Sequence, residues 1–301
     1  MIDGALLLDK PVGVSSNRAL QEAKKLYRAK KAGHAGTLDP LASGLLVVLF
    51  GEATKFAGPL LDDDKEYRAT LKLGERTTTG DAEGEVVERK SAAVPAAQVE
   101  AVLARFRGEL EQVPPMHSAL KRDGVPLYAL ARKGQTVERA ARRVRISALE
   151  KLDFKPPHLE LRVRCSKGTY VRTLAEDIGA ALGTCAHLSA LRRTASGRFD
   201  VQDAVALDAL AAMPESQRAR HLLALPELLA GLPRAELDAE QEARFRNGQT
   251  LKGFPPEEGL CAVYGTRGGV IGLGQADRAG ALRPLRLVAA SQTADKPRQT
   301  L

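Results

Sequence analysis

The part of this 301-residue chain richest in residues that could do chemistry is the run GHAGTLDPLASG at positions 33–44. Its glycines allow backbone angles that other residues resist, and Pro40 pushes Asp39 towards an extended conformation. An apolar run follows at once and predicts a buried strand directly after the loop. A carboxylate held rigidly at the edge of a strand suits a catalytic role. A turn in which Asp39 bonds its own backbone fits the same spacing equally well.

The elements that must position this loop follow from hydrophobic periodicity. Strands are predicted over residues 5–8, 44–50, 66–73 and 159–165, and helices after the serines at 15–16, around 99–106 and around 174–182. Half-buried alternating strands beside amphipathic helices favour the α+β class, with a mixed, largely antiparallel sheet and flanking helices.

A break in composition falls near residues 231–233, Gly-Leu-Pro. One amphipathic helix around 238–247 and short β-like runs at 260–264, 270–274 and 282–288 follow it, separated by Gly/Pro turns. We therefore expect a catalytic domain over 1–232, a small β-rich domain over 233–290 and a flexible tail over 291–301.

The net charge is +8, from 45 Lys and Arg against 37 Asp and Glu, and it is unevenly distributed. Residues 118–145 hold eight basic and two acidic residues, whereas the chain from 233 onward holds ten basic and eight acidic ones. A second basic cluster lies at 24–31. Such blocks are commonly solvated surface, but two of them beside apolar-periodic segments favour a face that follows a phosphate backbone.

Several classes of protein are excluded or disfavoured by motifs that the sequence lacks. The longest apolar run, at 44–50, is too short to span a bilayer, and the N-terminus has no signal-peptide pattern. Three distant cysteines and five scattered histidines form no CxxC or HExxH motif. We therefore expect a cytoplasmic protein with no membrane partner, no metal and no cofactor; Gly272-Leu-Gly274 lacks the context of a dinucleotide site.

Seven blocks of sequence follow one another in an order that identifies a family. They are KPVGVSS at 10–16 with GHAGTLDPLASG, then KEYR at 65–68, TTTGD at 77–81, QVPPMHSALK at 112–121, LYALARKG at 127–134, CSKGTYVRTL at 165–174 and AHLSALRR at 186–193. Together they closely resemble the bacterial tRNA pseudouridine synthases that modify the T-loop uridine, the pseudouridine-55 family. The C-terminal module resembles that family's small PUA-type RNA-binding domain.

The resemblance implies an isomerase. Such enzymes flip the target uridine out of the RNA, cut its N1–C1′ bond, rotate the base and rejoin it through C5. The reaction needs no cofactor and no group donor, which agrees with the missing motifs. The implied partner is the T stem-loop of tRNA, no protein partner is implied, and nothing demands more than a monomer.

Three catalytic residues are implied by matching positions. Asp39 corresponds to the family's essential aspartate, and Arg172 to the arginine that pairs with it and favours its ionised form. Tyr170 corresponds to a second active-site tyrosine, near the sugar, that could assist proton transfer. The sequence leaves open whether Asp39 attacks C1′, attacks the base or only stabilises a developing cation.

The base-binding residues are implied in the same way. Tyr67 matches the tyrosine that stacks on the target base, Leu191 an apolar residue that packs against it, and His34 the histidine that fills the space the base leaves. By its own pattern Tyr67 is better explained as a core residue, and a histidine that bonds locally in a turn is a reasonable interpretation of His34.

Basic residues complete the implied site. Lys10 opens the cleft in the family, in a role that is more structural than chemical, and Arg142 and Arg143 lie where the family has an RNA-gripping insertion, around 90–145. We expect these two arginines to contact RNA phosphates.

Two other functions fit part of the sequence. A non-catalytic RNA-binding or tRNA-folding protein would share the charge and the β-rich module, although the intact set of implied catalytic residues disfavours it. A carboxylate hydrolase such as a glycosidase commonly needs a second acidic residue across the bond, and the sequence offers Asp39 no convincing partner.

Overall fold

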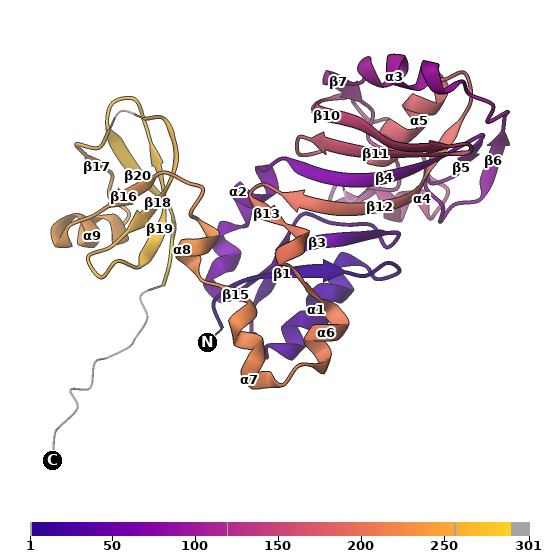
Figure 1. Ribbon diagram of the computed structural model, residues 1–301. Helices are drawn as coiled ribbons and strands as arrows, with labels where there is room; N and C mark the ends of the chain where they lie inside the picture. Colours follow the sequence, from indigo (N-terminus) through magenta and orange to yellow (C-terminus); the bar gives the residue numbers. More distant parts are fainter. Residues whose placement is uncertain (1, 119, 256, 290–301) are drawn as a thin grey trace.

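The computed structural model describes residues 2–118, 120–255 and 257–289, which form a large α+β body and a smaller β unit (Figure 1). The expected tail at 291–301 lies outside the described residues. Among the described helices, none is long and apolar enough to cross a membrane. The described part of the chain also has no cluster of three or more His, Cys, Asp or Glu side chains that could hold a metal ion.

The large body is built on one sheet of eleven strands with the order β14-β1-β3-β12-β4-β11-β10-β7, to which β2, β13 and β15 attach. The strands are β1 (Gly4–Lys10), β2 (Ala32–Ala35), β3 (Ala42–Phe50), β4 (Lys65–Leu73), β7 (Gly108–Gln112), β10 (Arg142–Lys155), β11 (His158–Cys165), β12 (Ala186–Ser196), β13 (Phe199–Asp200), β14 (Val205–Ala206) and β15 (Leu222–Leu223). Among the described strand pairs of this sheet, only β12–β3 and β1–β14 are parallel. The predicted mixed, largely antiparallel sheet is therefore confirmed.

Helices cover the two halves of this sheet, and three of the four lie where the periodicity predicted a helix. The α5 (Val171–Ala181) and α3 (Ala96–Ala104) helices pack their apolar faces against β4, β11 and β10, while α1 (Ser16–Leu26) and α6 (Leu207–Ala212) cover β1 and β3 (Figure 1). The predicted cap of α1 is present, because the Ser15 side chain accepts a hydrogen bond from the Arg18 amide.

Shorter elements connect these layers. They are η1 (Gly51–Phe56), α2 (Ala57–Asp62), β5 (Glu75–Thr77), β6 (Val86–Arg89), β8 (Lys121–Arg122), β9 (Val125–Pro126), α4 (Leu127–Ala131), η2 (Val201–Asp203), α7 (Glu215–Arg218), η3 (Ala219–His221) and α8 (Leu225–Leu228). The insertion expected around 90–145 is shorter than that range, because α3 belongs to the core and β7 pairs with β10. Within that range, the described residues of 113–141 contribute neither a strand to the main sheet nor a side chain to the main core cluster.

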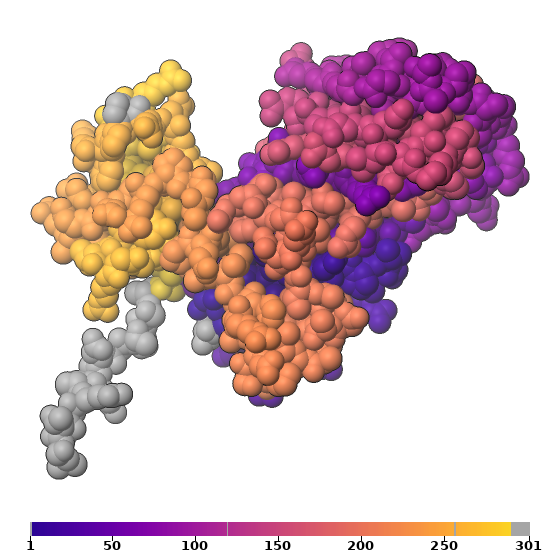
Figure 2. Space-filling model, viewed as in Figure 1, coloured from indigo at the N-terminus to yellow at the C-terminus, as the bar shows by residue number. Residues whose placement is uncertain are grey.

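The C-terminal unit is a five-stranded sheet with the order β16-β18-β19-β20-β17 and one helix. It contains β16 (Arg234–Glu236), α9 (Ala239–Arg246), β17 (Leu251–Lys252), β18 (Gly259–Tyr264), β19 (Val270–Ala276) and β20 (Ala281–Leu287). Figure 2 shows it standing to one side of the larger body. One apolar cluster, which includes Leu49 and Phe56 together with Tyr264 and Leu273, crosses the junction, so the two units share a packed interface.

Candidate active site

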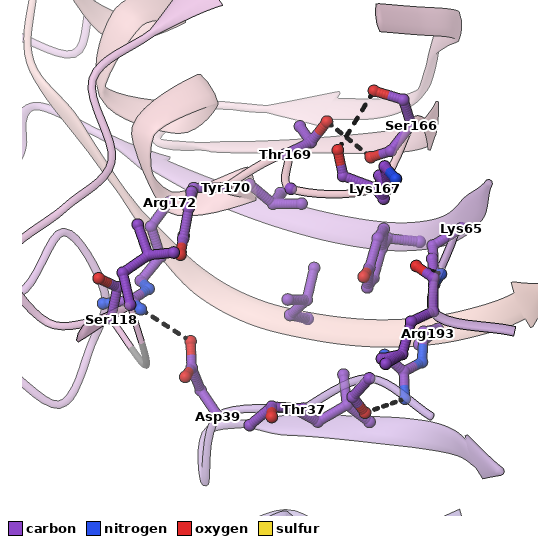
Figure 3. A pocket seen from close by; sticks show the side chains of 18 residues that line it. Thr37, Asp39, Lys65, Ser118, Ser166, Lys167, Thr169, Tyr170, Arg172 and Arg193 are labelled. Carbon is purple, nitrogen blue, oxygen red and sulfur yellow. Dashed lines mark hydrogen bonds and ion pairs between the residues drawn. The ribbon is translucent and has the colours of Figure 1, made fainter. Parts of the chain in front are cut away.

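A cavity of about 350 Å³ opens where β3, β12 and β4 meet. The loop between β2 and β3, which carries Asp39, forms one side, and residues 166–170, which lead into α5, form the other (Figure 3). Strand β12 lies between β3 and β4, and its Leu191 pairs with Ala42 on one side and Ala69 on the other. The cavity therefore rests on a strand that is paired on both sides.

The loop of Asp39 is fixed from two directions. The Ser16 hydroxyl accepts a hydrogen bond from the Leu38 amide at 2.7 Å and donates to the Leu38 carbonyl at 2.9 Å. The Gly13 amide donates to the Pro40 carbonyl at 2.8 Å. Ser16 was predicted only as a residue at the start of a helix, yet it also anchors the chain on both sides of the Leu38 peptide.

Arg172 approaches Asp39 from the first turn of α5, as the family resemblance implied. Its Nη2 lies 3.0 Å from Asp39 Oδ2 and donates to the His117 carbonyl at 2.6 Å, while Nη1 donates to the Thr79 carbonyl at 3.1 Å. The Arg172 side chain is 7% exposed and that of Asp39 is 42% exposed. The ion pair thus joins a buried, well-coordinated cation to a carboxylate that still faces the cavity.

The sequence motifs did not indicate a second carboxylate that pairs with Arg172. The Oδ2 atom of buried Asp81 lies 3.6 Å from Arg172 Nε, and Asp81 Oδ1 accepts hydrogen bonds from the Thr79 hydroxyl and the Glu83 amide. Asp81 is the last residue of the TTTGD block, but no local pattern in the sequence connects that block to Asp39. Arg172 stands between the two carboxylates, so they do not form the facing pair that a glycosidase uses.

The charge of Asp39 is balanced between opposing influences. Burial raises the pKa of its carboxyl group above the ordinary value of 3.8, the Arg172 and Lys10 cations lower it, and Asp81 raises it. Arg172 therefore acts against the desolvation that would otherwise favour the protonated form.

Tyr67 and Leu191 line the apolar floor of the cavity and also pack against the main core cluster. Tyr67 is therefore packed against the core and also reaches the cavity, and its stacking on a base stays a prediction. Tyr170 also lines the cavity, and its backbone amide donates to Gln112 Oε1 at 3.1 Å. Burial raises the pKa of both tyrosines, which keeps their hydroxyl groups protonated.

His34 lies on strand β2, opposite Val48, and not in a turn. It faces a second hollow, of about 470 Å³, that shares Asp39 and Arg172 with the first. Its buried Nδ1 has no hydrogen-bond partner in the described part of the chain. Burial and then the charge of Arg193 lower the pKa of its imidazole.

Lys10 is bonded within its own loop. Its side chain is completely buried, and Nζ donates to the Pro11 and Val14 carbonyls at 2.8 and 2.6 Å. Burial lowers the pKa of Lys10 to about 8. These hydrogen bonds close the loop in which Lys10 lies, and a contact between Lys10 and the substrate stays a prediction.

Arg142 and Arg143 are exposed at the start of β10, opposite Gln112 and Glu111 of β7. No strand was predicted there, because the segment had been interpreted only as charged surface. Neither arginine lines the cavity, although Arg142 is close enough to lower the pKa of Tyr170 against the effect of burial. The structure thus separates these two residues from the floor of the site.

Family models match almost the whole chain. The description "TruB family pseudouridylate synthase (N terminal domain)" matches residues 24–171, "tRNA pseudouridylate synthase B C-terminal domain" matches 172–232, and "Pseudouridine synthase II TruB, C-terminal" matches 233–288. The last two models meet at the point where the composition of the sequence changes.

Similar proteins agree with these models. The "tRNA pseudouridine synthase B" proteins of Burkholderia mallei strain NCTC 10247 and Ralstonia nicotianae are 55% and 56% identical over 95% of this chain and over 97% and 94% of their own lengths. A chain in the crystal structure of a Cbf5–Nop10–Gar1 complex superposes with a TM-score of 0.71 at 25% identity, covering 94% of this chain and 84% of that one. The chain therefore belongs to the TruB family of pseudouridylate synthases, a family of isomerases.

Proposed function

We propose that this enzyme converts the uridine at position 55 in the T-loop of tRNA to pseudouridine, with Asp39 as the essential residue. The observation that carries the proposal is the Asp39–Arg172 ion pair beside a cavity floored by Tyr67 and Leu191. Relatives that bear the name tRNA pseudouridine synthase B support tRNA as the substrate.

The cavity suits an extruded pyrimidine. Its volume of about 350 Å³ is in the range of small-molecule sites, and an aromatic ring beside an apolar side chain repays part of the cost of unstacking a base. Tyr67 stacks on the base and Leu191 packs against it. His34, in the neighbouring hollow, fills the space that the base leaves in the RNA.

The reaction breaks the N1–C1′ bond, turns the uracil and forms a C5–C1′ bond, after which the C5 proton leaves and N1 carries a proton. Asp39 acts in its ionised form whether it attacks C1′, attacks the base or stabilises a cation. Arg172 favours that form. Tyr170 retains its proton and stands beside the sugar as a donor.

Exposed cations outside the cavity hold the RNA. Arg142 and Arg143 contact phosphates of the T stem-loop, and the PUA-like C-terminal unit adds a second RNA-binding surface. The enzyme acts as a monomer in the cytoplasm.

Release of tritium from a tRNA T stem-loop labelled at C5 of uridine tests the proposal. We expect release by the unaltered enzyme and a rate lower by on the order of 10³-fold or more in Asp39→Asn, because the negative charge is lost while the shape is kept. RNA affinity should change by less than about 3-fold, since the substitution removes no positive charge.

Asp203→Asn is the matched control, because Asp203 is exposed on η2 and lines neither hollow. Its rate should equal that of the unaltered enzyme. Tight RNA binding without tritium release by the unaltered chain would instead support a non-catalytic RNA-binding protein.

A further inference from the structure

Arg193 is a buried cation that none of the functions above uses. Its side chain is among the largest that are fully buried, the residue is 1% exposed, and it lines the cavity from strand β12. No acidic side chain lies within ion-pair distance of it among the residues that the structure describes. Burying a guanidinium without a counter-ion costs folding free energy, so the hydrogen bonds of Arg193 must offset part of that cost.

Those hydrogen bonds join two parts of the active-site wall. Arg193 Nε donates to the Leu45 carbonyl at 2.6 Å, and Nη2 donates to the Gly36 carbonyl at 3.1 Å. Leu45 belongs to β3, and Gly36 lies in the loop that carries Asp39. Figure 3 shows Arg193 and Arg172 at opposite ends of this loop, with Thr37 and Asp39 between them.

The backbone of Arg193 is held as closely as its side chain. It pairs with Gly44 of β3 on one side and with Tyr67 of β4 on the other. At Gly44, where φ is +100°, a Cβ atom would come within 2.3 Å of the Arg193 carbonyl oxygen, so no larger residue allows this approach. Arg193 also faces the Tyr67 hydroxyl and lowers its pKa against the dominant effect of burial.

We propose that Arg193 is a positioning residue that fixes the loop of Asp39 relative to Tyr67, and so sets the distance between the carboxylate and the stacked base. The expected effect on catalysis rests on the proposed function. The claim that Arg193 fixes the loop is independent of that function. Arg172 pairs with the Asp39 carboxylate, and Arg193 bonds to the backbone of the loop that carries Asp39. A guanidinium can donate in two directions from one planar group, which an ammonium on a flexible stem does less well.

The test compares Arg193→Lys and Arg193→Met with the same substitutions at Arg192. Arg192 is the next residue on β12 and pairs with Asp9 at 2.7 Å with a side chain that is 41% exposed, so it offers a matched surface control. The measurements are kcat for tritium release at saturating RNA, the Kd for RNA, thermal unfolding, and amide hydrogen exchange at residues 36–39.

We expect kcat to fall by on the order of 10²-fold in Arg193→Met and about 10-fold in Arg193→Lys, because small displacements of reacting groups are costly. The Kd should stay within about 3-fold, because the cation is buried and contacts no phosphate. Exchange at 36–39 should rise about 10-fold or more in Arg193→Met while α1 stays protected, since only the loop loses its anchor. Both Arg192 variants should match the unaltered enzyme.

Three results obtained with folded variants would overturn the assignment. They are a kcat within about 3-fold of the unaltered enzyme in both Arg193 variants, a loss confined to the Kd, or exchange at 36–39 that does not rise. Failure of Arg193→Lys to fold at room temperature would also overturn it, by making Arg193 a residue of the fold alone. If the unaltered chain releases no tritium, the proposed function fails by itself, and the exchange measurement still decides whether Arg193 fixes the loop.

Discussion

The cavity at the β3–β12–β4 junction and the basic segment at 118–145 use the same residue type in opposite ways. In the cavity, Arg172 and Arg193 are buried and donate to named carbonyl groups on neighbouring elements. In the basic segment, Arg142 and Arg143 are exposed on a strand. We therefore expect burial to decide whether an arginine here organises the chemistry or binds a polyanion.

The physical reason is the environment of the charge. A buried guanidinium is little screened and keeps one geometry, so it can tune and place a single carboxylate. An exposed guanidinium is screened by salt but acts together with its neighbours on a phosphate backbone. Loss of a buried arginine should therefore appear in kcat and in pH dependence, and loss of exposed ones in Kd and in salt dependence.

The largest expected effect in this comparison is that of Arg172→Met. We expect kcat/KM to fall by on the order of 10²-fold or more, because a preorganised charge is lost. The Arg172 charge lowers the pKa of Asp39, so its removal raises that pKa further. Because the ionised form is the active one, the acidic limb of the kcat/KM profile should move to higher pH. An acidic limb that stays at the same pH would contradict the proposed difference in role between buried and exposed arginines.

Tyr67 tests the apolar part of the same region. Tyr67→Ala should lower kcat/KM by about 10- to 100-fold, the loss expected from one stacked base. Tyr67→Phe keeps the ring and should lose much less. An equal loss in both variants would show that the hydroxyl beside Arg193 matters more than stacking, and would sharpen the role of the buried cation.

Charge reversal of Arg142 and Arg143 together tests the exposed region. The Kd for RNA should weaken about 10-fold at low salt, and the slope of log K against log salt should become shallower by about 0.7 to 0.9 for each lost phosphate contact. The value of kcat at saturating RNA should not change. Lys151→Glu with Lys155→Glu, further along β10, makes the same change of charge and serves as the control. Unchanged affinity across a salt titration would contradict this assignment.

The smallest effect is expected at His34. Its imidazole should titrate below the ordinary value of 6.5 in an NMR experiment, because burial and the charge of Arg193 both disfavour the imidazolium. In Arg193→Met the pKa of His34 should rise only part of the way towards its ordinary value, since the burial of the imidazole remains. An identical titration in the two proteins would show that the field of this buried cation does not extend to β2.

Much of the fold could be predicted because its signals are local. Buried runs and alternation correctly predicted β3, β4 and β11. Capping serines with helical periodicity correctly predicted α1, and helical periodicity predicted α5. Strand β10 was missed because its alternation is masked by charges on the exposed face. Strand β2 was missed because its four residues are too few to show a period.

The sequence by itself determined which residues were candidates. A single carboxylate on a constrained loop before a buried strand, with the ordered motifs around it, indicated Asp39 and its family. Only the tertiary structure decided which cations face inward. The register of β12 between β3 and β4 places Arg193 against the loop, and the turn into α5 brings Arg172 to both Asp39 and Asp81. Local patterns cannot show these contacts, because the contacts depend on pairing between segments far apart in the chain.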